Sequence, residues 1–176
     1  WPGGASFERG DYEWRISQAV VEEAGPFSSF PGMERVLVVT EGAGPVLDHG
    51  GLAPSAKVGL LVPYRFSGDW PTRAELVDGR VADFNVLCRR GSAHADVEVW
   101  SGRVDRSVRA AQDEHLFLHV LSGGLDARSG GHEPTWKLAS GESLWLQPGA
   151  GIELDFDGAS CGVLVRVGRS RGLGDR

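Results

Sequence analysis

The chain is poor in cysteine and in long apolar runs. Its 176 residues include only two cysteines, Cys88 and Cys161, which form neither a CxxC pair nor a dense disulfide framework. A reducing cytoplasm is therefore the expected compartment. Apolar runs such as 36–39 are far shorter than the roughly 20 residues that a membrane-spanning helix requires, so no span is expected. The chain opens at Trp1 without a basic segment followed by an apolar one, which predicts no secretion signal.

Positive charge is scarce as well. The sequence has 24 acidic and 18 basic residues, for a formal net charge of -6. Among the basic residues only Lys57 and Lys137 are lysines, a bias that a GC-rich genome produces without any functional cause. An acidic surface repels phosphate backbones and anionic lipid headgroups. Nucleic acid and membrane surfaces are therefore not expected partners.

Glycine and short strand patterns are abundant. Apolar and polar residues alternate with a period of two at 94–99 and 152–157. Similar short runs occur at 14–21, 35–40, 58–62, 115–121, 143–146 and 162–167. Together with 26 glycines and 9 prolines, these runs predict an all-β, antiparallel sandwich or barrel. No stretch of a dozen residues keeps an apolar stripe at helical spacing, and Val81–Arg89 fits a short helix or a strand.

The two halves of the chain carry a faint internal repeat. In the first half, the strand at 35–39 runs into a glycine turn, and a later short strand closes at Pro63. In the second half, the strand at 115–121 does the same, and the later strand closes at Pro148. This order suits two jelly-roll half-barrels, although any all-β protein shows some such coincidences. The segment 77–91 would then bridge the halves.

Four motifs in the first half, in one order over residues 12–91, carry a resemblance to a known family. They are Trp14-Arg15-Ile16-Ser17, then Gly25-Pro26-Phe27-Ser28-Ser29-Phe30-Pro31-Gly32 with Arg35, then Pro63-Tyr64-Arg65-Phe66-Ser67-Gly68-Asp69, and Asp83-Phe84-Asn85-Val86-Leu87-Cys88-Arg89-Arg90-Gly91. In these motifs the chain resembles the HutD/Ves family. The family usually opens with Trp and a glycine run followed by Thr and Arg-Glu, and residues 1–9 are a shortened form of that opening.

The resemblance implies a bicupin, that is, two stacked, jelly-roll-like antiparallel β-barrels in one compact unit. It implies a single domain over 1–176, with a first half at about 10–76, a bridge at about 77–91 and a second half at about 92–170. Family members are encoded with histidine-utilisation enzymes, and a regulatory or metabolite-sensing role has been proposed for them. The expected role of this chain is therefore regulation within histidine utilisation.

The histidines lack the spacing of a cupin metal site. Such sites use two histidines separated by one residue, a carboxylate, and a third histidine after a Pro-x-Gly turn. His115 and His119 are instead four apart, and no histidine follows Pro148. We therefore expect no metal and no cofactor, and we interpret the five histidines as surface or loop residues. Neither serine nor cysteine lies in a Gly-x-Ser-x-Gly elbow, and Cys88 is expected to be a small core residue.

Three residues of the first two motifs are candidates for a pocket wall. Arg15 and Ser17 lie two apart and share one strand face, opposite Trp14 and Ile16. The same alternation fits ordinary solvent-facing residues, and it is the family motif that favours a pocket. Arg35 follows a Pro-Gly turn and precedes an apolar strand, which suits either a barrel mouth or a surface cap of the strand.

The other candidates belong to the later motifs. Asn85 offers both a hydrogen-bond donor and an acceptor, and the neighbouring Asp83 is expected to pair with Arg89 or Arg90. Tyr64 completes the set of expected ligand-binding residues, and no catalytic residue is assigned.

Two classes of function fit these residues. The first is a binding protein that holds a small carboxylate metabolite, such as urocanate or formiminoglutamate, through Arg15 or Arg35 with Ser17 and Asn85. The alternative is a metal-independent isomerase or hydrolase of a small carboxylate, with Glu13 or Asp83 and Tyr64 as the acid–base pair. We expect the binding protein rather than the enzyme. Pairing of sheet edges would also allow a homodimer.

Overall fold

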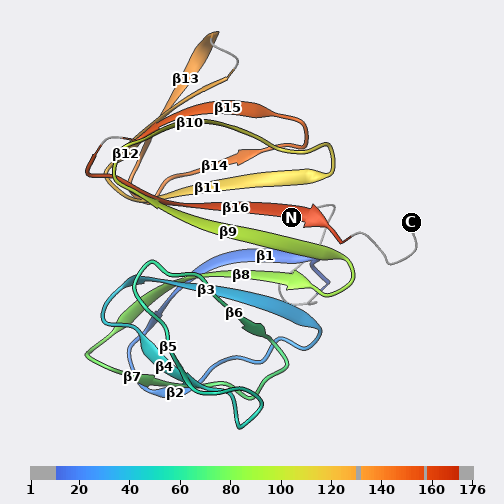
Figure 1. Ribbon diagram of the computed structural model, residues 1–176, viewed down its shortest axis with the longest axis vertical. Coiled ribbons are helices and arrows are strands. Elements are labelled where there is room, and N and C mark those ends of the chain that lie inside the picture. The colour runs from blue at the N-terminus through green and yellow to red at the C-terminus, as the bar shows by residue number, and fades with distance from the viewer. Residues whose placement is uncertain (1–10, 130–131, 157, 171–176) are drawn as a thin grey trace. The chain divides into compact units, whose positions relative to one another are not determined.

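A computed structural model describes residues 11–129, 132–156 and 158–170 (Figure 1). The opening at 1–9 lies outside these residues. All named elements within the described ranges are β-strands, and none of these ranges contains a helix long and apolar enough to cross a membrane.

The chain divides into two units, one formed by residues 1–94 with 170–176 and the other by 95–169. The strands of the first unit are β1 (Trp14–Val21), β2 (Gly25–Pro26), β3 (Met33–Glu41), β4 (Pro45–Asp48), β5 (Ala56–Lys57), β6 (Tyr64–Ser67), β7 (Arg73–Leu76) and β8 (Val81–Arg89). The second unit has β9 (Ala93–Ser101), whose first residues belong to the first unit, and then β10 (Val104–Arg109), β11 (Glu114–Ser122), β12 (Gly124–Ser129), β13 (His132–Ala139), β14 (Ser143–Leu146), β15 (Gly151–Phe156) and β16 (Cys161–Arg169).

Each unit is built from two four-stranded sheets with the same strand order. The first unit has β1-β8-β3-β6 and β2-β7-β4-β5, and the second has β9-β16-β11-β14 and β10-β15-β12-β13. Each strand of the first unit therefore corresponds to the strand eight places later in the second. Two antiparallel half-barrels of one topology confirm the all-β, bicupin fold that the motifs implied.

The internal repeat is present, although its proline alignment was wrong. β6 begins immediately after Pro63, whereas its counterpart β14 ends before Pro148. The short run before Pro63 instead forms a turn in which Leu60 makes an isolated bridge to Val39. Turn residues and strand ends look alike in sequence when both are apolar, which is why the two prolines were matched.

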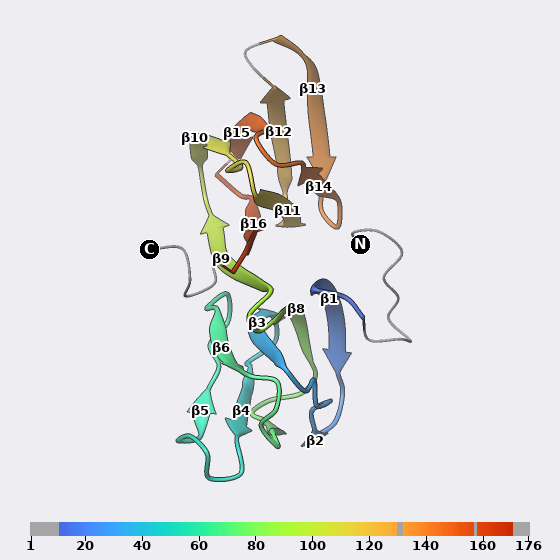
Figure 2. The ribbon, with the colours of Figure 1, turned by 90° about the vertical axis from the view of Figure 1, so that its right-hand side faces the viewer.

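The segment predicted to bridge the halves contains the inner strand of the first sheet. β8 pairs with β1 on one side and with β3 on the other, and Figure 2 shows the three strands side by side. These two neighbours supply its backbone hydrogen-bond partners, so Val81–Arg89 is a strand and not a helix. That the two units unfold as one cooperative domain stays a prediction.

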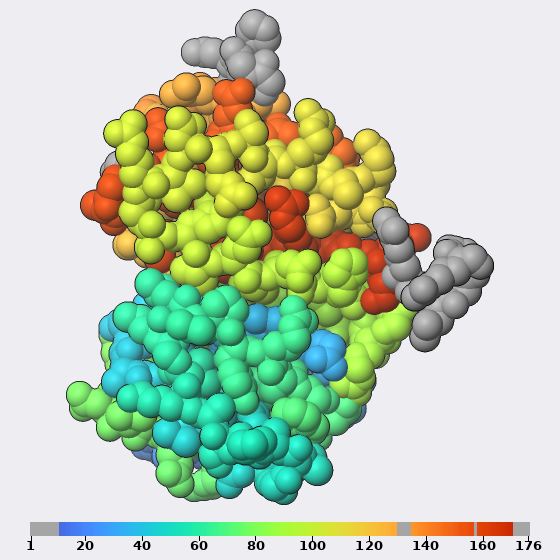
Figure 3. Space-filling view, viewed as in Figure 1, coloured from blue at the N-terminus to red at the C-terminus, as the bar shows by residue number. Residues whose placement is uncertain are grey.

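The interiors of the two units differ in composition. The apolar cluster of the second unit extends along its barrel and includes Leu116, Leu164 and Phe156. The first unit has a smaller cluster around Leu37 and Phe66. The segment that contains β4, β5 and β6 forms much of the face of this unit that Figure 3 shows. The remainder of the first interior is occupied by polar side chains and a cavity.

Candidate ligand-binding site

Strand register directs the first-half candidates to one face. Arg15 lies opposite Leu87 and Ser17 opposite Asn85 across β1 and β8, while Arg35 lies opposite Leu87 across β3 and β8. Directly opposed residues share a face of the sheet. These side chains therefore converge on the interior of the first unit, where a cavity of about 550 Å³ lies.

Strands β1 and β8 and the loop after β2 supply most of the cavity wall. Its lining residues are Arg15, Ser17, Gln18, Ala19, Val20, Val21, Glu22, Glu23, Gly25, Pro26, Phe27, Ser28, Phe30, Arg35, Asp83, Asn85 and Leu87. Four of the five expected ligand-binding residues, all except Tyr64, are among them.

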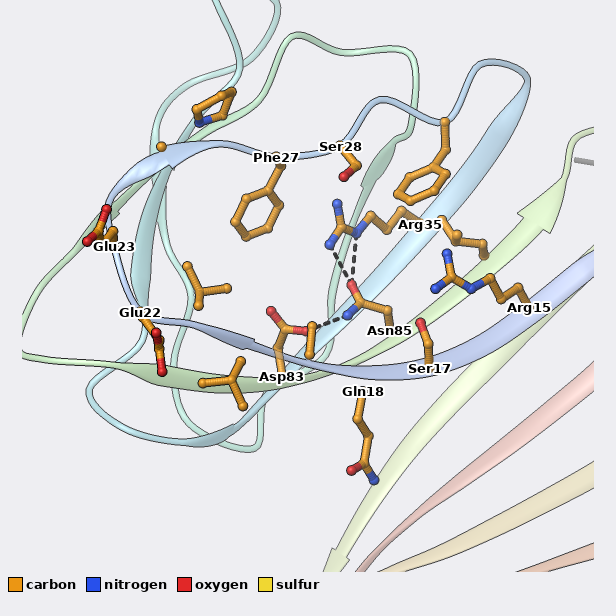
Figure 4. A pocket seen from close by; sticks show the side chains of 17 residues that line it. Arg15, Ser17, Gln18, Glu22, Glu23, Phe27, Ser28, Arg35, Asp83 and Asn85 are labelled. Atoms are coloured by element: carbon orange, nitrogen blue, oxygen red, sulfur yellow. Dashed lines mark hydrogen bonds between the residues drawn. The ribbon is translucent and has the colours of Figure 1, made fainter. Parts of the chain in front are cut away.

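Three buried polar side chains in the cavity wall are connected in series by hydrogen bonds, and we call this series the polar chain. The Nε and Nη2 groups of Arg35 both donate to Oδ1 of Asn85, at 2.9 and 2.6 Å. Nδ2 of Asn85 donates in turn to Oδ1 of Asp83 (Figure 4). Arg35, Asn85 and Asp83 expose only 7, 5 and 2 % of their surface. Asn85 therefore connects a buried cation to a buried anion.

Aromatic rings surround the guanidinium of Arg35. Its Cζ lies 4.6 Å from the ring centroid of Phe27, 5.2 Å from that of Phe66 and 5.7 Å from that of Phe30. Arg15 lies 5.9 Å from the Phe30 ring as well. Ring faces attract cations without neutralising them, so the rings around Arg35 leave the positive charge of its guanidinium in place.

Burial and neighbouring charges shift the pKa values of Arg35 and Asp83, the two ends of this chain of hydrogen bonds. Burial lowers the pKa of Arg35 to about 10, while Asp83 raises it and the nearby Arg15 lowers it further. Burial raises the pKa of the Asp83 carboxyl, while the hydrogen bond from Asn85 and the charge of Arg35 lower it. The arginine stays charged at neutral pH, and Asp83 acts as its internal counter-ion.

Two polar atoms of these hydrogen-bonded side chains are left over. Within the part of the chain that the structure describes, Nη1 of Arg35 and Oδ2 of Asp83 have no hydrogen-bond partner. Neither atom is one of the fully buried side-chain atoms without a partner among the same residues, so both are accessible to solvent. Because both residues line the cavity, one donor group and one acceptor atom are open to whatever fills it.

The loop that carries Phe27 and Phe30 is anchored by the other family motifs. The amide of Phe30 donates to the carbonyl of Gly68 at 2.8 Å, and the amide of Gly32 donates to Oδ1 of Asp69 at 2.8 Å. A Cβ atom on Gly68 would lie 2.5 Å from the Phe30 carbonyl oxygen, so only glycine allows this approach. Arg90 forms an ion pair with the second oxygen of Asp69, so Asp69 is held by both Gly32 and Arg90.

This anchoring corrects the expected ion pair. Arg90 pairs with Asp69 and, at 3.3 Å, with Glu34, rather than with Asp83. Side chains alternate along β8, so Asp83 points into the barrel. Nη2 of Arg89 donates to the backbone carbonyl of Tyr12 at 3.3 Å. The backbone and side-chain hydrogen bonds from Gly32 and Arg90 lower the pKa of the Asp69 carboxyl.

Matching β-bulges allow the two units to be compared residue by residue. The register of β3 with β8 shifts between Val39 and Glu41, and the register of β11 with β16 shifts between Val120 and Ser122. The two bulges occupy the same place in their strands. Val39 and Val120 are therefore equivalent, and the remaining pairs follow by counting along the strands.

The polar chain of the first unit has no polar counterpart in the second. The equivalents of Arg35, Asp83 and Asn85 are, in order, Leu116, Gly162 and Leu164. The ring of Phe156 packs directly on Gly162, where a Cβ would lie 2.9 Å from its Cζ atom. At these three positions the same topology therefore carries residues of an apolar core in the second unit and hydrogen-bonded polar side chains beside a cavity in the first.

Tyr64 belongs to a different cluster and does not line the cavity. Its hydroxyl lies 3.0 Å from Nε2 of His49, whose Nδ1 lies 2.9 Å from the hydroxyl of Thr72. Thr72 donates to the carbonyl of Trp70 at 3.3 Å, so Nδ1 of His49 is the donor to Thr72 and Nε2 accepts from Tyr64. These bonds connect the residue after β4 with the residue before β7 and with the first residue of β6.

Two histidines are buried. His49 lies in the loop after β4, which agrees with the expectation of surface or loop histidines, whereas His119 lies within β11 and contradicts it. His49 is 0 % and His119 is 6 % exposed. Nδ1 of His119 lies 2.8 Å from the hydroxyl of Ser143. Burial lowers the pKa of both imidazoles. In each case a hydroxyl group distant in sequence forms a hydrogen bond with the ring, a partner that sequence spacing does not reveal.

Among the described residues, the side chains needed to hold a metal ion or to act as an acid–base pair are not brought together in this site. No cluster of three or more His, Cys, Asp or Glu side chains able to hold a metal ion occurs within residues 11–129, 132–156 and 158–170. Glu13 is exposed and, like Tyr64, does not line the cavity, so Asp83 has neither of them beside it. Cys88 is buried, as expected, and burial raises the pKa of its thiol to about 12.

Sequence reasoning missed Phe27, Phe30 and the inward direction of Asp83 as features of the site. The signals were present, because both rings lie in the second family motif and Asp83 lies two residues before Asn85 on one strand face. What was missing was knowledge of which face of β8 turns inward.

Comparisons with known proteins agree with this architecture. The HutD family model matches residues 1–163. Protein Ves of Cronobacter sakazakii is 36 % identical over 114 residues, which are 64 % of this chain and 60 % of that protein. The matched part of the chain thus spans less than two thirds of that relative.

Solved structures give the same result over most of the chain. A conserved protein of unknown function from Pseudomonas aeruginosa PAO1 has a TM-score of 0.80 at 28 % identity, covering 95 % of this chain and 85 % of that one. HutD from Pseudomonas fluorescens SBW25 has a TM-score of 0.71 at 28 % identity, covering 91 % and 80 %. Since the family model matches nearly the whole length, the chain belongs to the HutD family.

Proposed function

We propose that the cavity of the first unit binds a small metabolite through its carboxylate, without a metal ion. The observation that carries this proposal is the contrast between two barrels of one topology. Where the second has Leu116, Gly162 and Leu164, the first has the buried Arg35, Asp83 and Asn85. Buried charges destabilise a fold relative to well-packed apolar residues. Their presence in one barrel only therefore favours a binding role.

The chemistry of the open atoms suits a carboxylate. Nη1 of Arg35 faces the cavity as a charged donor, and Arg15 adds a second positive charge nearby. A guanidinium group matches the planar, two-oxygen geometry of a carboxylate better than an ammonium does. The hydroxyl of Ser17 lies on the same face and supplies a further donor. The rings of Phe27 and Phe30 supply apolar surface for the rest of the ligand.

Family membership supports a role in histidine utilisation. The chain belongs to the HutD family, and one similar structure is HutD of Pseudomonas fluorescens in a formate condition. Urocanate and formiminoglutamate are therefore the first candidate ligands, and formate is the smallest carboxylate to test. A protein that binds such an intermediate reversibly would sense its concentration, so we propose a regulatory rather than catalytic role.

The enzymatic alternative loses its proposed acid–base pair. An isomerase or hydrolase would need a second titratable side chain near Asp83, yet Tyr64 hydrogen-bonds with His49 and Glu13 lies outside the cavity wall. Asp83 is itself engaged by Asn85. These contacts support binding over catalysis.

Thermal unfolding with a panel of carboxylates tests the proposal. Formate, glutamate, urocanate and formiminoglutamate would be added to the wild type and to Arg35→Lys, Arg15→Lys and Arg73→Lys. A ligand that binds only the native state at ~100 times its Kd adds about 2.7 kcal/mol of stability. We expect this stabilisation in the wild type and in Arg73→Lys, whose exposed residue on β7 is not among those that line the cavity.

Arg35→Lys and Arg15→Lys should weaken the stabilisation, because lysine keeps the charge but loses the planar fork. No stabilisation by any carboxylate would contradict the proposal. Equal stabilisation of all four proteins would move binding away from this cavity.

A further inference from the structure

The charged residues of the cavity wall are ordered along strands β1 and β8. Arg15 lies opposite Leu87 across β1 and β8, and Arg35 lies opposite the same Leu87 across β3 and β8. Asp83 lies four residues before Leu87 on β8, and residues separated by an even number share one face of a strand. The two arginines are therefore attached at one level of the sheet and the aspartate at another.

Two further carboxylates extend this order. Glu22 and Glu23 follow the end of β1 and line the cavity as well. Strand β1 runs past the level of Asp83 before it ends, so both glutamates lie beyond that level. Figure 4 shows them on the side of Asp83 that is away from Arg35. The cavity thus has a basic end and an acidic end, whatever other contacts its charged residues make.

Asp83 presents an acceptor atom between these two ends. Its Oδ1 accepts from Nδ2 of Asn85, and no residue within the described ranges donates to its Oδ2. Oδ2 is accessible to solvent, and Figure 4 shows it directed away from Asn85, on the side where Phe27 lies. An ionised carboxylate only accepts hydrogen bonds, and charged N–H groups form the strong ones. A ligand carbonyl or a second ligand carboxylate at this place would meet lone pairs alone.

We propose that Asp83 is a specificity-determining residue whose Oδ2 accepts a hydrogen bond from a nitrogen of the ligand. This inference rests on the proposed function, in which Arg35 holds the ligand's carboxylate, and it narrows the ligand class to carboxylates whose other end bears an N–H group. A protonated nitrogen suits the acidic end best, because Glu22 and Glu23 attract it as well. Both glutamates are exposed, so solvent weakens their effect and Asp83 makes the main contact.

The polar chain sets the separation of the two ligand groups. The guanidinium of Arg35 reaches the side chain of Asn85, which lies two residues from Asp83 on β8. Because a strand rises by about 3.4 Å per residue, these two positions are about 7 Å apart. A ligand must therefore have a short chain between its carboxylate and its nitrogen. 4-Aminobutyrate, in which three methylene groups separate the two, is a suitable probe.

4-Aminobutyrate and pentanoate form a matched pair. Both are unbranched and have the same number of heavy atoms, and pentanoate has a methyl group where 4-aminobutyrate has its protonated amine. Titration calorimetry would give both Kd values for the wild type, for Asp83→Asn and for Asp78→Asn. In Asp83→Asn an oxygen still accepts from Asn85, but an NH2 group replaces Oδ2, so the acceptor becomes a donor. Asp78 is exposed between β7 and β8 and is not among the residues that line the cavity.

We expect the wild type and Asp78→Asn to bind 4-aminobutyrate about ten-fold more tightly than pentanoate, the scale of one hydrogen bond between charged groups. Asp83→Asn should lose or reverse this preference, and the ratio of the two Kd values is insensitive to changes that affect the carboxylate end of both probes alike. A wild type that binds pentanoate as tightly as 4-aminobutyrate, or an unchanged ratio in Asp83→Asn, would overturn the inference. The wild-type comparison needs no variant, and if Asp83→Asn does not fold, Asp83→Ser removes the same charged acceptor.

These outcomes differ from a failure of the proposed function itself. The absence of binding by both probes and by every carboxylate of the thermal panel would contradict carboxylate binding, and with it the inference. Binding of both probes with equal affinity and with dependence on Arg35 would leave carboxylate binding supported and would overturn the role of Asp83 alone. Stabilisation by the panel without binding of 4-aminobutyrate would have the same meaning.

Discussion

Replacing Asn85 by leucine tests whether the polar chain exists for binding and not for folding. Leucine is the residue at the equivalent position of the second unit, Leu164, so the backbone accommodates it in this topology. In Asn85→Leu the side chain that joins Arg35 to Asp83 is lost. Nε and Nη2 of Arg35 lose their acceptor, and Oδ1 of Asp83 loses its donor.

The expected cost follows from those lost bonds. Breaking a buried charged pair by removing a partner costs about 3 to 5 kcal/mol. The rings of Phe27 and Phe66 still face the guanidinium, and both charges can turn toward water in the cavity, which reduces the loss. We therefore expect about 3 kcal/mol, which for a chain of this size lowers the unfolding midpoint by roughly 6 to 12 °C.

A triple variant distinguishes the two explanations. Arg35→Leu, Asp83→Val and Asn85→Leu together remove both charges along with their connector and copy the apolar character of the second barrel. Because replacing a complete buried ion pair by apolar residues is often neutral or stabilising, the triple variant should recover most of the loss. Urea denaturation of wild type, single and triple variants gives the three free energies of unfolding. A triple variant as unstable as Asn85→Leu, or less stable, would refute the reasoning.

Three further predictions concern the rest of the molecule. Gly68→Ala should cost about 1 to 3 kcal/mol and weaken carboxylate binding, because the new Cβ would displace the backbone at Phe30; Gly158→Ala, with no atom near its Cβ, should leave denaturation and binding unchanged. Burial lowers the pKa of His49 from 6.5, so stability should be full above about pH 6.5 and fall below it as the unfolded chain takes up the proton; urea denaturation at several pH values should show a smaller fall for His49→Gln, and an equal fall would contradict this. Elemental analysis of protein purified without chelator should find no stoichiometric transition metal, and near one equivalent that resists dialysis would contradict the metal-free proposal.

Local patterns predicted several of the strands, although the run at 58–62 forms a turn. The alternation at Ile152, Leu154 and Phe156 predicted β15, and its apolar residues are the buried ones. Such patterns report which residues share a face, and burial of one face then follows. Arg15 and Ser17 were placed on one face by the same rule, and the register of β1 with β8 brings that face into the cavity.

Contacts between residues that are far apart in the sequence could not be predicted from local patterns. His49 can be buried because Thr72 and Tyr64 satisfy its two ring nitrogens, and these partners are 23 and 15 residues away in the sequence. Arg90 meets Asp69 rather than Asp83 because Arg90 follows the end of β8, whereas Asp83 lies near its start. The difference between the barrels became visible only once the bulges had fixed the register.

A crystal structure with the carboxylate that stabilises the protein most tests the central claim directly. The account predicts that the ligand's carboxylate lies within hydrogen-bond distance of Nη1 of Arg35, inside the cavity lined by Phe27 and Ser17. A carboxylate bound outside that cavity, or in the second unit, would contradict it.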